Sequence, residues 1–584
     1  MNIVARQKET LQALKGVMIA VLVLLSPVFG WAGSSKLAAD LDTTKGDRTD
    51  VIVVYKDGPS SQHVTKAVNR GAAIHRHLYS AKGTAMSLAG NQIEKLVADD
   101  PDIAFVAPDR PVHTFGESNT PNFVAVNADM AQSAGYNGSG VFVAVLDSGI
   151  DSTHPDLANR VVYSQDFTGE GEGTQDYYGH GTHVAGIIAG TAAESTCSSC
   201  TLKYMGIAPG VQLVNLKVLD KNGAGKDSNV IAAIDQVISY QQQNPGQQHI
   251  INLSLGRGVY TSYKNDPLDQ AVEAAWKAGI VVVVAAGNYG RDNSAGENGY
   301  GTITVPGNDP YVITVGAMNT LGTMSRADDV IASYSSKGPT MLDHVVKPDL
   351  VAPGNLITST LGAYATMDTL YPTTQVPKSA YISGGGSAAS PYYMTLSGTS
   401  MAAPVVSAAA AMLLQQNPNL TPDQIKARLM KTAYKNLVQH STATDPTTGI
   451  TYTEQADIFT VGAGYLDINA ALNNNDQASS ATGVAMSPTV TFSTSKGVTT
   501  VSLVTGSSVL WGSSVLWGSS VVWGTNVLVN GSSVLWGSSV LWGSSTTEGF
   551  SVLWGSSTSP LSVLWGSSTD SSEATSVLTK GDKK

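Results

Sequence analysis

The sequence predicts a three-layer α/β sandwich with a mainly parallel sheet, preceded by a small α+β domain and followed by a tail of Trp/Gly/Ser repeats. Three observations support this. The 584 residues exceed what one hydrophobic core fills, so we expect two or three folded units. Between residues 120 and 475, apolar runs without polar alternation are separated by helical segments. Beyond residue 475 the composition becomes repetitive.

Residues 1–33 have the pattern of an export signal. Arg6, Lys8 and Lys15 form a positive start, residues 17–25 are apolar, and residues 30–32 include small side chains at the cleavage positions. The alternative is a membrane anchor, but the apolar run is shorter than the about 20 residues that a spanning helix needs. We therefore expect a signal peptide and a secreted, extracellular protein.

Residues 48–116 predict the small α+β domain. Two short apolar runs, at 51–55 and 103–106, have the composition of strands, and an amphipathic stretch lies at 93–97.

The α/β domain is predicted from residue 120 to residue 475. Four apolar runs, at 141–146, 213–219, 250–255 and 280–286, match strands buried on both faces of a sheet. One helix start is well marked, because Thr421 can cap it, Pro422 fits its first position and Gln424 can close a capping box.

Residues 476–584 form a separate C-terminal region. Residues 497–547 contain no charged side chain, and the motif Val-Leu-Trp-Gly-Ser-Ser recurs with seven of the nine tryptophans. A repeat of six would place alternate residues on one face of a strand, which favours a β structure, whereas the Gly and Ser content favours a linker. Both interpretations stay open. The uncharged aromatic character also suggests cell-surface attachment through this tail.

Charge excludes one class of partner. The formal net charge is -11, and an acidic surface repels polyanions, so we expect no nucleic-acid binding.

Three short motifs carry catalytic chemistry. A serine hydroxyl attacks an amide only if an imidazole takes its proton and a carboxylate orients that imidazole. Asp147 ends an apolar strand, His180 opens a helix, and Ser400 lies in a Gly-Thr-Ser turn before an Ala-rich helix. The N-terminus of that helix can stabilise an oxyanion, and Asn288, after the apolar run 280–286, can add an amide donor.

These motifs, in this order, resemble those of subtilisin-like serine peptidases. The resemblance covers residues 120–473 and implies an endopeptidase with nucleophile Ser400, general base and acid His180, and orienting Asp147. It further implies that the oxyanion donor is Asn288 and that substrate binds along a short set of residues: Ser254, Leu255, Gly256, Ala286 and Gly287. The preceding domain resembles an inhibitory propeptide that is cut between about residues 112 and 120. Catalysis by this family needs no cofactor. The resemblance also implies two kinds of partner, which are protein or peptide substrates and the chain's own propeptide.

Other interpretations of these residues exist. A serine in such a turn is usually a helix cap. The presence of all three motifs in this order favours a nucleophile over a cap. His180 and His183 could be metal ligands, yet no acidic third ligand has a recognised spacing, so we predict no catalytic metal and a structural His183. A protein of another class, a surface or assembly protein whose repeat tail is the functional part, is the competing hypothesis.

The two cysteines depart from the family pattern. Cys197 and Cys200 lie where many family members bind calcium, and an exported chain favours a disulfide between them; a zinc site would need two more ligands. Asp156 matches one calcium ligand, but the loop adds only Glu194, so a structural calcium stays an open possibility. A long insertion between residues 354 and 398 is expected to form a lip of the active site or an outer loop.

Overall fold

The computed structural model describes residues 36–38, 40–114, 123–294, 298–445, 448–495, 498–503, 527–528, 532–536, 540–544 and 581–582. The predicted signal peptide lies outside the described residues, as does most of the repeat tail. Among the described helices, none is both long enough and apolar enough to cross a membrane.

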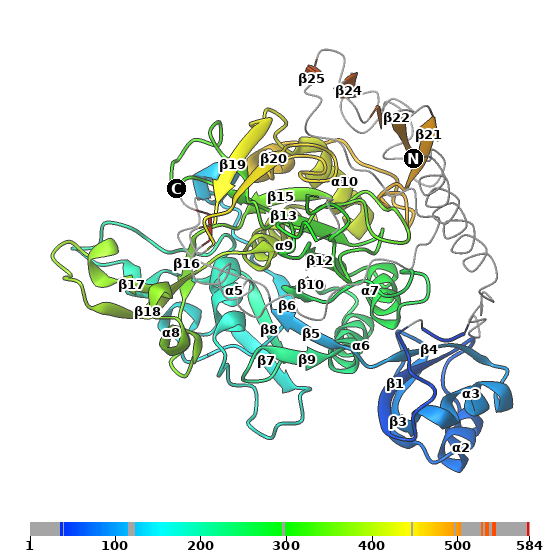
Figure 1. Cartoon of the computed structure of the whole chain (residues 1–584). Helices are drawn as coiled ribbons and strands as arrows, with labels where there is room; N and C mark the ends of the chain where they lie inside the picture. Colours follow the sequence, from blue (N-terminus) through cyan, green and yellow to red (C-terminus); the bar gives the residue numbers. More distant parts are fainter. Residues whose placement is uncertain are drawn as a thin grey trace, which may run out of the picture.

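The first folded unit is a four-stranded antiparallel sheet with two helices, as the sequence predicted for an α+β domain (Figure 1). The strand order is β2-β3-β1-β4. Its elements are β1 (Arg48–Tyr55), α2 (Ser61–Asn69), β2 (Ala73–Leu78), β3 (Gly83–Ala89), α3 (Gly90–Asp99) and β4 (Ile103–Pro108).

The central unit is an eight-stranded sheet of order β14-β13-β12-β10-β6-β8-β7, with β15 also paired to β13. All pairs are parallel except β13 with β14. The strands are β6 (Val141–Asp147), β7 (Val161–Asp166), β8 (Gln212–Lys217), β10 (Gln248–Leu253), β12 (Val281–Ala285), β13 (Ile313–Asn319), β14 (Val330–Ile331) and β15 (Leu350–Pro353). Every residue of β12 and β13 is buried, which explains the unbroken apolar runs.

Helices cover this sheet and complete the mainly parallel α/β fold. Helices α6 (Asp227–Gln243) and α7 (Pro267–Lys277) pack against each other, as do α5 (His180–Ala189) and α9 (Thr399–Gln416). Residues 399–414 of α9 are all buried, so this helix is a core element. Helix α10 (Pro422–Thr432) begins with the predicted capping box, in which Gln424 N donates to Thr421 Oγ1 and Thr421 N to Gln424 Oε1.

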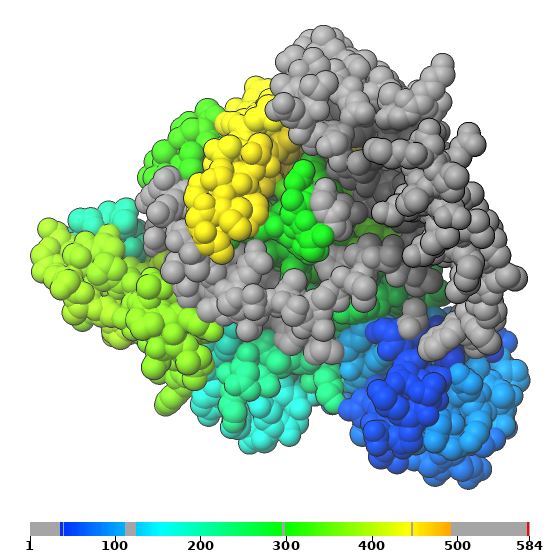
Figure 2. Space-filling model, viewed as in Figure 1, coloured from blue at the N-terminus to red at the C-terminus, as the bar shows by residue number. Residues whose placement is uncertain are grey.

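The insertion before α9 projects away from the sheet (Figures 1 and 2). It contains β16 (Ile357–Thr360), α8 (Met367–Leu370), β17 (Gln375–Pro377) and β18 (Ala389–Leu396). It packs on the cysteine loop, where Thr201 N donates to Tyr381 O at 2.8 Å and Ser383 N to Ser199 O at 2.8 Å. A cluster of Tyr204, Val376, Tyr381 and Tyr393 fills the space between them. The insertion is therefore an outer layer built on that loop.

Smaller elements complete the described chain. They are α4 (Ala128–Ser133), the hairpin of β19 (His440–Thr444) and β20 (Thr451–Gln455), α11 (Ile468–Leu472), and short antiparallel strands at β21 (Val490–Ser495), β22 (Val498–Leu503), β23 (Val527–Leu528), β24 (Ser532–Trp536) and β25 (Val540–Ser544).

Three short strands lie at the edge of the sheet. The strand β5 (Pro111–Thr114), which continues from the first unit, lies between β9 (Ala224–Lys226) and β11 (Leu255–Gly256) and is antiparallel to both.

Candidate active site

The carboxylate and the imidazole predicted from the first two motifs are in direct contact. Asp147 is the last residue of β6, and His180 is the first residue of α5. His180 Nδ1 lies 2.8 Å from Asp147 Oδ1 and 3.0 Å from Oδ2, and both side chains are buried. Since Nδ1 faces the carboxylate, any proton that the ring exchanges with a hydroxyl is carried by Nε2.

A second carboxylate, which the sequence analysis missed, fixes the start of α5. Asp176 Oδ1 accepts from Gly179 N at 2.7 Å and from Ser148 Oγ at 2.9 Å, while Oδ2 accepts from Thr182 N at 2.8 Å. Burial raises the pKa of Asp176 above its usual value, and these donors act against that rise. Because these donors flank both Asp147 and His180, Asp176 holds the two motifs in register. An acidic residue four positions before His180 was the available sequence clue.

His183 has the structural role expected for it. Its Nε2 donates to Ile357 O at 3.0 Å, which ties α5 to β16. Burial, together with the nearby His180, lowers the pKa of His183 to about 3, so the ring is neutral at physiological pH. Among the described residues, the one cluster spaced for a metal ion is His63, Asp100 and Asp102 in the first unit, and it includes neither His180 nor His183.

Ser400 lies in the first turn of α9, which packs against the helix that begins at His180. Ser400 Oγ donates to Ser254 O at 3.1 Å, and Ser254 Oγ donates to Ser400 O at 2.8 Å. The predicted nucleophile is thus joined directly to the predicted substrate-binding residues.

Asn288 is oriented by the residue before the serine. Its Oδ1 accepts from both N and Oγ1 of Thr399, each at 3.0 Å, so the amide NH₂ is the end of the side chain left to donate. Thr399 Oγ1 in turn accepts from Gly287 N at 3.1 Å. Gly287 has φ +107°, and a Cβ there would lie 2.7 Å from Thr304 Cγ2, so only glycine fits. Ala286 O accepts from Thr304 N at 3.1 Å, which fixes the same turn.

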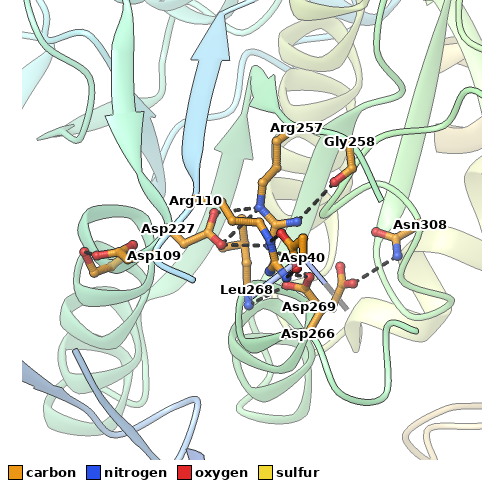
Figure 3. A network of polar contacts seen from close by, with 11 residues as sticks. Asp40, Asp109, Arg110, Asp227, Arg257, Gly258, Asp266, Leu268, Asp269 and Asn308 are labelled. Carbon is orange, nitrogen blue, oxygen red and sulfur yellow. Dashed lines mark hydrogen bonds and ion pairs between the residues drawn. The ribbon is translucent and has the colours of Figure 1, made fainter. Parts of the chain in front are cut away.

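The edges of the candidate substrate groove are held together by one arginine (Figure 3). Arg257 directly follows β11, and Asp227 directly follows β9. Arg257 donates from Nε and Nη2 to the two oxygens of Asp227 at 2.9 and 2.8 Å, and Nη2 also donates to Asp266 Oδ1 at 2.8 Å. Because β5 lies between β9 and β11, this ion pair joins the ends of the two strands that flank β5.

This network places one buried cation between two buried carboxylates. Burial lowers the pKa of Arg257, but Asp227 and Asp266 more than offset that effect and hold the pKa above its usual value. Burial raises the pKa of Asp227 to about 6, although Arg257 acts in the opposite direction. The arginine therefore stays charged, and its buried charge is stabilised by the two carboxylates.

The cysteine loop is closed by a disulfide between Cys197 and Cys200. Asp156 is bonded within the protein through both oxygens: its Oδ1 accepts from Glu194 N at 2.9 Å and its Oδ2 from the Tyr393 hydroxyl at 2.7 Å. These bonds join the loop to the insertion.

Comparisons with known proteins agree with this geometry. A family model described as the subtilase family matches residues 138–464. Serine protease AprX of Bacillus subtilis (strain 168) is 42% identical over 295 residues, which cover 50% of this chain and 61% of AprX. Subtilisin E of the same organism is 32% identical over 423 residues, which cover 72% of this chain and 94% of subtilisin E.

A solved structure supports the fold alone. The structure of fervidolysin from Fervidobacterium pennivorans, described as a keratinolytic enzyme related to subtilisin, aligns with a TM-score of 0.54 at 23% identity and covers 75% of this chain and 62% of fervidolysin. The family model spans more than half of the chain, and its region contains the contacts described above. The chain belongs to the subtilase family of serine peptidases.

Proposed function

We propose that the chain is an exported endopeptidase that cleaves peptide bonds in proteins through an acyl-enzyme on Ser400. The observation that carries the proposal is a pair of contact sets on two helices that pack against each other: Asp147 with His180 at the start of α5, and Asn288 with Thr399, next to Ser400, at the start of α9. Export rests on the signal peptide predicted over residues 1–33 and on the disulfide, which forms in oxidising compartments.

Each residue has a defined role in this mechanism. His180, oriented by Asp147, takes the proton of Ser400 as its oxygen attacks the carbonyl carbon, and then gives that proton to the leaving amine. The negative charge on the carbonyl oxygen is stabilised by the amide NH₂ of Asn288 and by backbone N–H groups at the start of α9. Water then hydrolyses the acyl-enzyme by the same route, with His180 acting again as base and acid.

The domain at residues 48–116 acts, in this proposal, as an inhibitory propeptide. Its described part lies against α6, where Asp235 accepts from Tyr79 N at 2.9 Å and Ser80 N at 2.7 Å, and Asp109 Oδ1 accepts from Ser228 N at 2.8 Å. Figure 2 draws this unit directly against the central domain. The following β5 occupies the slot between β9 and β11, where a bound substrate would lie as an added strand.

The register of β5 sharpens the predicted cleavage position. His113 pairs with Gly256 and Thr114 with Leu255. The described strand ends at Thr114, beside Leu255, and the next residue along that edge is Ser254, whose carbonyl accepts from Ser400 Oγ. We therefore propose that maturation cuts one residue beyond β5, at the bond between Phe115 and Gly116, within the range 112–120 expected from the sequence.

Two measurements test the proposal. Labelling with a serine-directed fluorophosphonate should modify Ser400, and Ser400→Ala should abolish labelling, turnover and self-cleavage together. N-terminal sequencing of the mature protein should begin at Gly116. An unlabelled protein would favour the surface or assembly role, whereas a labelled protein that starts elsewhere would refute only the register assignment.

A further inference from the structure

A short segment near residue 580 is buried in the central domain, far along the chain from its neighbours. Asp582 is 1% exposed, although it follows the last residue of α11 by 110 positions. Its surroundings are Arg291, just after the oxyanion residue, Ser333, and Asn355, which precedes β16.

The carboxylate of Asp582 is fully engaged. Its Oδ1 accepts from Ser333 Oγ at 2.6 Å and Arg291 Nη2 at 3.0 Å, and its Oδ2 accepts from Ser333 N at 2.7 Å. A buried carboxylate is stable only with such donors, so this set of contacts compensates its desolvation.

The site also recognises the backbone of the segment. Asp582 N donates to Asn355 Oδ1 at 3.1 Å, and Asn355 Nδ2 donates back to Asp582 O at 3.2 Å. Gly581 has φ +47°, and a Cβ there would lie 2.7 Å from Asn355 Oδ1 and 2.9 Å from Ser397 Oγ. The site therefore selects a glycine followed by an aspartate.

The central domain holds the receiving side chains in place. Arg291 Nε donates to Ser333 Oγ at 2.9 Å, and its Nη1 lies 3.5 Å from the buried Asp445. The guanidinium carbon is 5.4 Å from the ring centre of Tyr452, which is in the β20 strand. A fixed guanidinium with a donor set matched to a second carboxylate is a preorganised binding site.

We propose that Arg291, Ser333 and Asn355 form a binding site for a Gly-Asp segment, and that Gly581–Asp582 of the same chain occupies it. The chain is then fastened to the catalytic domain again at residues 581–582, beyond the repeats in the sequence. The anchor lies next to the segments that carry the reacting groups, because Arg291 is three residues after Asn288, and Ser397, which donates to Asn355 Oδ1 at 3.2 Å, is three residues before Ser400. Docking thereby stabilises the catalytic domain itself.

The first test uses the full chain in the inactive Ser400→Ala background, which prevents autolysis. Asp582→Asn should lower the Tm by about 5 °C or more, because it removes one of the two carboxylates that face a buried guanidinium. Glu573→Gln, which removes the same charge elsewhere in the tail, should change the Tm by less than about 1 °C. Hydrogen exchange at the Ser333 amide should accelerate at least tenfold in Asp582→Asn alone. Equal behaviour of the two variants would overturn the proposal.

The second test asks whether the site accepts the segment in trans. A chain lacking residues 576–584 should bind a labelled nonapeptide of that sequence and regain Tm on saturation. The same peptide with Asn at the aspartate position should bind at least tenfold more weakly. No binding, or equal binding of both peptides, would contradict the proposed site.

Sedimentation of the full chain distinguishes the occupant. A monomer at all concentrations is expected if the segment docks on its own chain. A dimer that dissociates on Asp582→Asn would place the segment in a second copy and overturn the intrachain docking.

Discussion

Thr399 provides the sharpest test of how Asn288, the proposed oxyanion donor, is held. Its hydroxyl donates to Asn288 Oδ1 at 3.0 Å and accepts from Gly287 N at 3.1 Å. Thr399→Val keeps the shape of the side chain and the backbone N–H that also bonds Asn288, but it removes both hydroxyl bonds. The variant therefore loosens Asn288 without deleting it.

The expected loss can be worked out from these bonds. One neutral hydrogen bond contributes about 0.5–1.5 kcal/mol, and a factor of ten in rate corresponds to about 1.4 kcal/mol. We therefore expect kcat to fall about tenfold in Thr399→Val. Removal of a whole oxyanion donor lowers kcat by about 10²–10³, a value measured in subtilisin itself, and Asn288→Ala should reach that range. KM should stay within about twofold, because the slot that binds the peptide backbone is untouched.

A double-mutant cycle decides the matter. Steady-state kinetics on one peptide substrate would be compared for Thr399→Val, Asn288→Ala and the double variant, with Thr399→Ser as the control that retains the hydroxyl. If Thr399 acts by positioning Asn288, the valine substitution should lower kcat only slightly in the Asn288→Ala variant. A full tenfold loss in the Asn288→Ala background would refute this reasoning.

Three further predictions concern charge and covalent structure. Arg257→Met should raise KM for peptides that fill the slot more than tenfold, as measured by steady-state kinetics, and should leave hydrolysis of a single-residue ester within about twofold; an equal effect on both substrates would contradict the role in groove width. Asp329, whose pKa burial raises to about 7, makes the folded state bind more protons than the unfolded state between about pH 4 and 7. Stability should therefore fall as pH rises through that window, and urea melts should show that Asp329→Asn gains roughly 2 kcal/mol over the parent between pH 5 and pH 8, after allowance for partial solvent screening; a constant difference would exclude the assignment. Loss of the disulfide in Cys197→Ser/Cys200→Ser should lower the free energy of unfolding by at most about 2 kcal/mol in urea melts, since it closes a loop of only four residues, and global unfolding would contradict this.

The strands were predictable because burial on both faces leaves a local trace in the sequence. The run 141–146 became β6, and the run 280–286 contains β12. The run 250–255 behaved differently: β10 ends at Leu253, and Leu255–Gly256 belong to a different sheet that pairs with β5. Apolar character reports burial but not hydrogen-bond partners, so the change of sheet at Ser254 was invisible in the pattern.

The proposed reacting groups could be singled out from the sequence for a related reason. Asp147, His180 and Ser400 must each lie at an element boundary with defined backbone geometry, and small residues around them record that need. The residues that support these groups are not surrounded by a comparable pattern of small residues. Asp176 acts through hydrogen bonds that any nearby carboxylate could make, and Asp582 reaches Ser333 across 249 positions of sequence.

The groove illustrates why supporting residues matter as much as reacting ones. A subtilase binds its substrate as a strand between two edges, so the spacing of those edges must be set before any substrate arrives. In this chain the guanidinium of Arg257 joins the end of one edge to Asp227 at the end of the other, and we expect the spacing to depend on it. The same guanidinium reaches Asp266, which caps α7, so the slot is tied to the helical layer beneath it. Buried charge at this place costs desolvation energy, and what it provides in return is a rigid slot of fixed width beside Ser400.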